Sequence, residues 1–255
     1  MPPKPPSARL THFLMIPLIT PTSRPQLRSS LTAFREKVTT TRTSENPDGI
    51  PEKAIRPLGS LHLTLGVMSL VTPELIQSAL EILQRLDLKG ILLKSGATQH
   101  QDDESKDLEP QKQTPGLTIT LQGIESMHDP SSTSVLFAPP IPSPQLTTFC
   151  QSLKQVFIDA KLMVEDTRPL LLHATILNTI YVPGVRDKTK GKAGHGKRKA
   201  RLTINAEEIL QDYEDFVWMK DVKVEKVAIC RMGAQKVDDE ELGEEYVVEE
   251  SVVMP

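Results

Sequence analysis

The chain has 255 residues, of which 38% are hydrophobic and 25% charged, and its formal net charge is −3. This length and composition are typical of a soluble globular protein with a substantial core, and they argue against a disordered chain. A net charge this small excludes a global basic field, so any contact with nucleic acid has to be local. No apolar run approaches the roughly 18 to 20 residues that span a bilayer, and we therefore expect no membrane partner.

The two cysteines, Cys150 and Cys230, are far apart in the sequence and lack the spacing of metal ligands. This usage favours buried free thiols in a reducing compartment, with a single disulfide as the alternative. The chain also has no cluster of acidic residues and histidines with metal-ligand spacing, so we expect neither a metal nor another cofactor.

Residues 1–9 contain four prolines and predict a flexible lead-in, with no sign of a signal peptide. An apolar strand is expected over 10–19, with Pro17 near an edge or at the exit of the strand. A helix is then predicted over 25–40, because apolar residues recur there at spacings of four, three and four: Leu27, Leu31, Phe34 and Val38.

After an apolar strand around 61–65, Thr72 and Pro73 are suited to cap and open a helix that runs to Leu86. Residues 95–116 are polar and predict a long mobile insertion. Alternating residues 117–121 predict a strand with one wet face, and we expect 135–138 to pair with it.

The second half continues with a helix over 144–160, a strand over 170–182 and a glycine-rich basic loop over 184–201. A short helix over 206–213, a strand over 222–231 and a strand over 246–253 complete it. This order of elements weakly repeats that of the first half. The sequence therefore predicts an α+β fold in which residues 10–255 form one two-lobed domain, with antiparallel sheets flanking a central groove and helices outside.

Two near-identical apolar stretches, 61–65 and 172–176, each contain a histidine and a threonine two positions apart: His62 with Thr64, and His173 with Thr175. Residues at i and i+2 of a strand point to the same face, so each imidazole and hydroxyl should project together. One such triplet is more often structural than functional. Two copies, one in each half of the chain, favour a functional pair.

These residue types suit cleavage of a phosphodiester. A histidine, whose unperturbed pKa is near 6.5, can act as general base or general acid, and two histidines can divide these roles. The hydroxyls of Thr64 and Thr175 can donate to the phosphate oxygens, on which negative charge develops. Such a site needs no metal, and the sequence leaves open which histidine is the base.

Five segments carry a resemblance to the 2H phosphoesterase superfamily and, within it, to the A-kinase anchor protein 7-like branch: 11–18, 61–66, 122–127, 172–179 and 228–231. The resemblance implies a pseudo-symmetric 2H fold, His62 and His173 as the acid/base pair, and Thr64 and Thr175 as phosphate-binding residues. It also implies opening of 2′,3′-cyclic phosphates, cleavage of 2′-5′ linkages or trimming of RNA ends. Some relatives carry an RNA-binding KH domain ahead of the phosphoesterase domain, and fewer than a dozen residues precede the first expected strand here, so the chain is either a shorter relative or a fragment.

Two further residues are weaker candidates for substrate binding. Arg231 could hold a phosphate through bidentate hydrogen bonds or be a surface charge. Tyr181 shares a strand with His173 if that strand stays regular, and it could stack on a base or be a half-buried strand residue. His12 is expected to have a packing role.

The basic loop over 184–201 has three compatible interpretations: a solvated loop, a nuclear import signal, or a guide for RNA near the groove. The sequence thus predicts a metal-independent RNA phosphodiesterase that is a monomer on its own and takes RNA or a nucleotide phosphodiester as its partner. Its expected location is the nucleus, with the cytoplasm as an additional location left open. The alternative is an RNA-binding or scaffolding subunit of a transcription-coactivator, helicase or repair complex, with weak or no catalysis.

Overall fold

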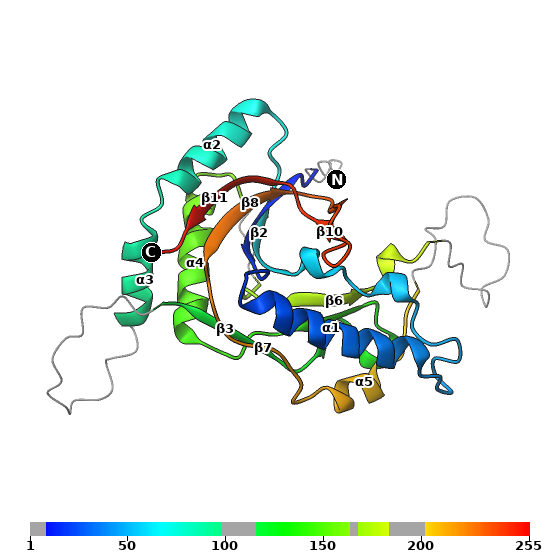
Figure 1. The fold of residues 1–255 in the computed structure, drawn as a ribbon. Coiled ribbons are helices and arrows are strands. Elements are labelled where there is room, and N and C mark those ends of the chain that lie inside the picture. Colours follow the sequence, from blue (N-terminus) through cyan, green and yellow to red (C-terminus); the bar gives the residue numbers. More distant parts are fainter. Residues whose placement is uncertain (1–8, 98–115, 164–167, 184–201) are drawn as a thin grey trace, which may run out of the picture.

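The computed structural model describes residues 9–97, 116–163, 168–183 and 202–255 (Figure 1). Within these ranges it contains five α-helices: α1 (Ser23–Thr40), α2 (Pro73–Gln84), α3 (Leu88–Ala97), α4 (Pro144–Asp159) and α5 (Glu207–Asp212). The strands in the same ranges are β1 (His12–Pro17), β2 (His62–Met68), β3 (Thr118–Gln122), β4 (Glu125–Ser126), β5 (Val135–Ala138), β6 (Ala174–Asn178), β7 (Val217–Lys223), β8 (Lys226–Arg231), β9 (Gln235–Lys236), β10 (Glu244–Glu245) and β11 (Val248–Val253). No helix in the described part of the chain is long and apolar enough to cross a membrane.

The first lobe is built on a four-stranded antiparallel sheet in the order β11-β8-β1-β2. Its central strand β1 pairs with β2 on one side and with β8 on the other, so the two ends of the chain meet in one sheet (Figure 1). Pro17 ends β1, as the sequence predicts, at a position where its missing N–H does not interrupt the ladder. This arrangement places β2, the strand with the first histidine, at the edge of the sheet.

The second lobe contains a three-stranded antiparallel sheet, β4-β5-β6, and the antiparallel pair β3-β7. The segment that leaves β5 joins them, because the Gln122 N–H donates to the Pro139 carbonyl and the Ile141 N–H donates to the Thr120 carbonyl. The edge strands β2 and β6 contact each other. The two strands that carry the histidine motifs therefore meet where the lobes join.

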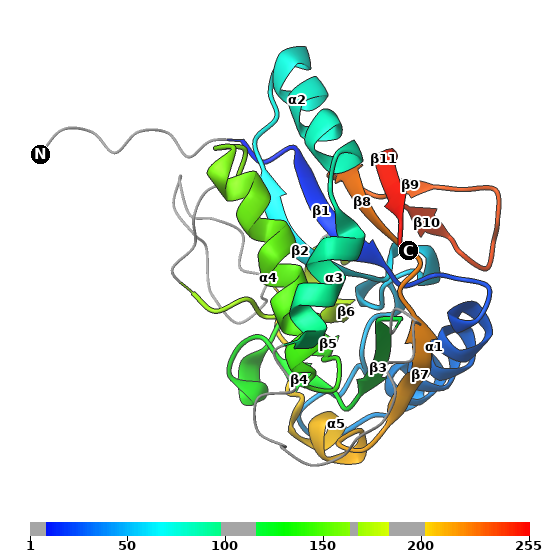
Figure 2. The same cartoon turned by 90° about the vertical axis from the view of Figure 1, so that its left-hand side faces the viewer.

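Helices α1 and α4 are exchanged between the lobes. Helix α1 follows β1 but packs on β7, where the Ser30 hydroxyl donates to the Trp218 carbonyl over 2.9 Å and the Phe34 ring lies 5.3 Å from the indole. Helix α4 follows β5 but lies over β2, with α3 beside it (Figure 2). Neither lobe is therefore built from one continuous half of the chain.

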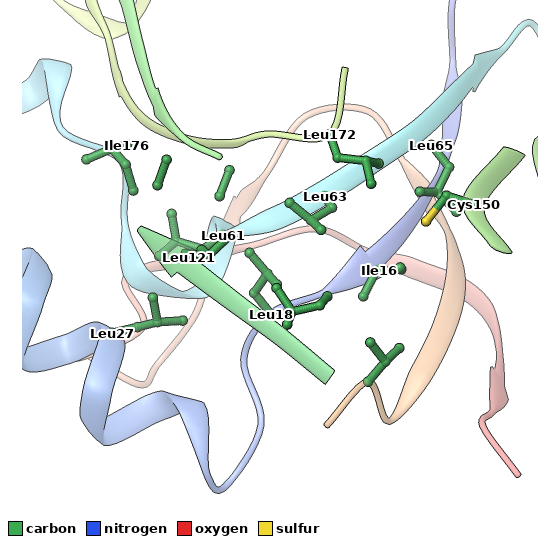
Figure 3. Packing of buried hydrophobic residues seen from close by; sticks show 14 of the residues in the cluster. Ile16, Leu18, Leu27, Leu61, Leu63, Leu65, Leu121, Cys150, Leu172 and Ile176 are labelled. Carbon is green, nitrogen blue, oxygen red and sulfur yellow. The ribbon is translucent and has the colours of Figure 1, made fainter. Parts of the chain in front are cut away.

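One large apolar core runs through both lobes (Figure 3). Leu63 and Leu65 of β2 are fully buried in it, together with side chains from β1, β3, β6, α1 and α4. Cys150 and Cys230 are both buried free thiols, as predicted, and burial raises the pKa of each to about 12. Because strand side chains alternate, the apolar face of β2 leaves the intervening His62 and Thr64 on the opposite face.

The predicted pairing of residues 117–121 with 135–138 is wrong. Strand β3 pairs with β7, and all four residues of β5 pair instead with β4 and β6. The two segments meet only beyond β5, at 139–141, where Pro139 and Pro140 have no N–H with which to continue a ladder. The sequence placed the contact in 135–138, whereas it lies in the segment that directly follows.

Two further expectations need correction. Residues 95–97, expected to begin a mobile insertion, belong to α3, which the sequence did not predict. The expected single strand over 222–231 is two strands in different lobes, β7 and β8, since the chain turns at Val224 and Glu225. Valines before the turn, in it and after it (Val222, Val224 and Val227) resemble one continuous apolar strand and concealed the turn.

Other expectations hold. The Thr72 hydroxyl caps α2 by accepting the Leu75 N–H, and Pro73 occupies its first turn. The predicted inner face of α4 is buried at Leu146, Phe149, Cys150, Leu153 and Phe157, whereas Val156 is only partly buried. The lead-in over 1–8, most of the predicted insertion (98–115) and the basic loop over 184–201 lie outside the described residues.

Candidate active site

His62 and His173 stand at corresponding places in the two lobes. His62 begins β2, and His173 immediately precedes β6. In both segments the residues on either side of the histidine are buried, whereas the histidine and the threonine two positions on are only partly buried. The predicted alternation is therefore present, and each motif presents its polar pair on the face opposite the core.

Each imidazole is oriented by the carbonyl of the residue two positions before it. Nδ1 of His62 lies 2.7 Å from the Ser60 carbonyl oxygen, and Nδ1 of His173 lies 2.9 Å from that of Leu171. A carbonyl only accepts hydrogen bonds, so Nδ1 carries the proton in both rings. Each neutral ring consequently has its lone pair on Nε2, the nitrogen that is left for chemistry.

His62 is held in its neutral form. Its pKa is lowered to about 4, mainly by burial; the hydrogen bond to the Ser60 carbonyl opposes this shift, and the charges of His173 and Arg56 add to it. Burial has this sign because it disfavours the charged imidazolium. A pKa of about 4 leaves His62 neutral at pH 7.

Thr64 lies directly beside the reactive nitrogen of His62, with Oγ1 and Nε2 3.0 Å apart. Because Nδ1 of the ring carries the proton, the Thr64 hydroxyl donates to the lone pair of Nε2. Thr175 differs, since its hydroxyl has no hydrogen-bond partner among the described residues. One hydroxyl is thus engaged with a histidine, and the other is available to a ligand.

Thr64 and His173 line one cavity of about 920 Å³. Its walls are largely apolar, from Leu65, Val67, Met127, Met163, Leu170 and Leu171, and they also carry Lys154 and Lys161. The cavity is large enough for a nucleotide, and its lysines and Thr64 provide donors for anionic oxygens. It contains one residue from each predicted motif.

Aromatic residues pack around the two histidines. Phe13 of β1 and Tyr246 lie 5.1 Å and 5.0 Å from the His62 ring, centroid to centroid, and Phe137 of β5 lies 5.2 Å from the His173 ring. Phe13 also packs against Met15 and Cys230, in a small cluster separate from the main core. Both imidazoles are therefore oriented by packing as well as by a hydrogen bond.

The structure does not bring Arg231 to the histidine pair. Arg231 of β8 pairs with His12 of β1, which in turn pairs with Met68 of β2. His62 lies six residues from Met68, about 20 Å along the strand. The Arg231 side chain instead forms an ion pair with Glu249, with Nε 2.8 Å from the carboxylate. His12 is buried beside the same carboxylate, in keeping with its expected packing role.

Tyr181 is not on the strand of His173. Strand β6 ends at Asn178, whose side chain accepts the Ile180 N–H and caps the short 3-10 helix η4 (Thr179–Tyr181). The strand does not stay regular up to Tyr181, so the expectation that Tyr181 shares a strand with His173 is wrong. Tyr181 is 45% exposed, and its ring is covered by the guanidinium of Arg56, whose Cζ lies 3.8 Å from the ring centroid.

Arg56 was missed by the sequence. It lies in an irregular turn-rich segment six residues before His62, where no periodicity or motif distinguishes it, yet it is buried and its charge acts on His62.

Among the described residues, no group of three or more His, Cys, Asp or Glu side chains is arranged to hold a metal ion.

Comparison with known proteins shows similarity over most of the chain. The chain is 26% identical over 174 residues to the uncharacterized protein C15D4.13c of Schizosaccharomyces pombe, which is 68% of each chain. It is 26% identical over 214 residues to mouse activating signal cointegrator 1 complex subunit 1, covering 81% of this chain and 54% of the mouse protein. Escherichia coli LigT, solved in complex with 3′-AMP, superposes with a TM-score of 0.49 and 16% identity over 96% of this chain and 98% of LigT.

The sequence model of one family, described as the AKAP7 2′5′ RNA ligase-like domain, matches residues 10–253. The match includes both histidine motifs and every strand of the two lobes. It confirms the resemblance to the 2H phosphoesterases, and the chain belongs to the AKAP7 2′5′ RNA ligase-like domain family.

Proposed function

We propose that the protein is a metal-independent RNA phosphodiesterase that hydrolyses a 2′,3′-cyclic phosphate or a 2′-5′ linkage. The observation that carries the proposal is the joint placement of Thr64 and His173 on one nucleotide-sized cavity, with His62 hydrogen-bonded to Thr64. A hydroxyl donor, an acid and a base are then available to one phosphate. Family membership supports a phosphoesterase-type reaction.

The geometry favours His62 as the base. Its imidazole is neutral at pH 7, and the hydrogen bond from Nδ1 to Ser60 leaves the lone pair on Nε2. In the proposed step, Nε2 of His62 takes a proton from the attacking water, whose oxygen bonds to phosphorus. His173 gives a proton to the ribose oxygen as the bond between that oxygen and phosphorus breaks.

Thr64 and Thr175 donate to the non-bridging oxygens in this proposal. Negative charge accumulates on these oxygens in the transition state, so donors fixed beside them accelerate the reaction. Thr175 can donate without breaking an existing hydrogen bond, whereas Thr64 first has to turn away from His62.

The test uses the purified protein in EDTA with three short RNAs, which carry a terminal 2′,3′-cyclic phosphate, an internal 2′-5′ linkage or only 3′-5′ linkages. We expect cleavage of one of the first two RNAs. The variants His62→Ala and His173→Ala should each lose about 10²- to 10⁴-fold in rate. His12→Ala is the matched control, because His12 is a buried histidine of the same sheet that lies at the far end of β1.

Activity that survives either active-site substitution would refute the two-histidine mechanism. Loss of activity in EDTA, with recovery on addition of a divalent cation, would refute metal independence. Failure of the wild-type protein to cleave any of the three RNAs would refute the enzymatic proposal itself.

The second candidate is an RNA-binding or scaffolding subunit of a nuclear coactivator, helicase or repair complex. The observation that favours it is the similarity to a mouse protein named as a complex subunit, although the aligned region is only 54% of that protein. This candidate predicts RNA binding without cleavage and an unchanged affinity in His62→Ala. Its nuclear placement can be tested by fluorescence localisation of the chain with and without residues 197–201.

A further inference from the structure

Arg56 is a buried cation without an anionic partner among the described residues. The residue is 5% exposed, and its Nη2 has no hydrogen-bond partner in that part of the chain. None of the ion pairs formed in the described part of the chain includes it. Other arginines, such as Arg24 and Arg231, do pair with carboxylates there. Arg56 thus stands out as a guanidinium with unused donor capacity.

The contacts of Arg56 place it beside the histidine pair. Its backbone N–H donates to the Ile176 carbonyl of β6 over 2.8 Å, which ties the segment before β2 to the strand of the second motif. Its guanidinium covers the Tyr181 ring and interacts with the Tyr246 hydroxyl. The Tyr246 ring in turn lies 5.0 Å from the His62 ring.

This environment orients the guanidinium without neutralising it. A stacked aromatic ring and a tyrosine hydroxyl hold its plane, but neither carries the negative charge that a buried cation needs. The fixed planar fork of an arginine matches the oxygens of a phosphate, and its charge cannot be removed at physiological pH. An anion supplied from outside would complete the site.

We propose that Arg56 is a substrate-binding residue that donates to a phosphate oxygen of the nucleotide bound beside His62. The inference rests on the proposed function, since it names a further contact of the same site. In this proposal Tyr181 does not stack on a base through the ring face that Arg56 covers. Its ring instead supports the guanidinium in the position from which the guanidinium reaches the phosphate.

Binding measurements separate this inference from catalysis. Isothermal titration calorimetry of the full chain with adenosine 3′-monophosphate, inorganic phosphate and adenosine reads out the phosphate contact alone. Removing a charged hydrogen bond in Arg56→Gln should weaken binding of adenosine 3′-monophosphate by about 10- to 100-fold. Binding of adenosine should be unchanged. Arg56→Lys, which keeps the charge but loses the fork, should fall between Arg56→Gln and wild type.

Arg85→Gln is the matched control, because Arg85, which directly follows α2, has a side chain that is 79% exposed, and binding should match wild type. If Arg56→Gln fails to fold, the Arg56 Nε–Hε signal of the wild-type chain, followed by ¹⁵N NMR, should shift on titration with inorganic phosphate. Equal affinity of wild type and Arg56→Gln for adenosine 3′-monophosphate, or an Arg56 signal that saturating phosphate leaves in place, would overturn the inference. Phosphate binding through Arg56 without cleavage of any RNA would refute the proposed function and leave this inference standing.

Discussion

The hydroxyl of Thr64 donates to Nε2 of His62 across 3.0 Å, so in the ligand-free protein the proposed base is already engaged. A bound phosphate competes for that hydroxyl, because its oxygens accept a hydrogen bond more strongly than a neutral imidazole does. In the proposed mechanism Thr64 turns to the phosphate, which releases the lone pair of His62 for the attacking water. The proposal thus couples substrate binding to activation of the base through one side chain.

The acidic limb of the pH–rate profile should lie near pH 4. In the proposed mechanism His62 must be neutral, and burial lowers its pKa to about 4. The profile of kcat/KM for cyclic-phosphate hydrolysis, which reports the free enzyme, should therefore decline on its acidic side only below about pH 5. An acidic limb near 6.5, the value of an unperturbed histidine, would contradict the role of His62 as the buried base.

Thr64→Val and Thr175→Val should both slow the reaction but differ in stability. Each substitution removes a donor to the phosphate and should lower kcat by about 10²-fold. Thr64→Val also removes the hydrogen bond to His62 and should lower the free energy of unfolding by about 1 kcal/mol, whereas the Thr175 hydroxyl has no partner to lose among the described residues. Steady-state kinetics and urea denaturation of the two variants test this. Equal stability of the two would show that the His62 contact contributes nothing.

Stability should rise with pH between about 4 and 6.5. In that window the unfolded chain binds a proton at His62 that the folded protein does not, so the free energy of unfolding increases as pH rises. The contribution of His62 is complete above 6.5 and is lost as pH falls towards 4. The contribution of His62 to the free energy of unfolding is at most about 3 kcal/mol, because its pKa falls from 6.5 to about 4.

The measurement is urea denaturation of wild type and His62→Gln at several pH values from 4 to 7. The difference between the two proteins should change across the window, since only wild type has this titration. Parallel curves would show that His62 is not buried as a neutral group.

Gly123→Ala should destabilise the protein more than Gly233→Ala. Both glycines have positive φ, at +77° and +95°, so alanine is strained at either position by about 1–2 kcal/mol. A Cβ on Gly123 would also lie 2.9 Å from the Glu214 carbonyl oxygen, whereas one on Gly233 would meet nothing within 4 Å. We expect urea denaturation to show a loss of more than 2 kcal/mol for Gly123→Ala. Equal losses of stability in the two variants would mean that the backbone near Glu214 moves away from the added Cβ at little cost.

The sequence predicted the histidine pair because period-two alternation is a local property. Buried Leu63 and Ala174 between the polar residues of each motif determine which way His62 and His173 point, wherever the strands lie in the fold. The roles of the two histidines could not be predicted in the same way. They depend on burial and on the charge of Arg56, which comes from another segment and acts through space.

The failures of the sequence prediction had different causes: the partner of β3 and the role of Arg56 depended on non-local contacts, whereas Tyr181 was displaced by a local cap. The partner of β3 comes from residues about 100 positions later in the chain, and nothing in 117–121 specifies it. Tyr181 leaves the strand of His173 because Asn178 caps a turn, which the apolar residues after it did not indicate. Arg56 became a candidate only once Tyr181 and Tyr246 were seen to enclose it.

The exchange of α1 and α4 between the lobes affects how the protein forms during synthesis. Helix α1 is complete by residue 40, but its packing surface on β7 is not made until residue 217 and beyond, and β1 waits equally long for β8. Neither lobe can close on a ribosome that has translated only the first half of the message. The site, which needs a strand from each lobe, therefore assembles late, and a nascent chain exposes the apolar faces of α1 and β1 until nearly the whole sequence has emerged.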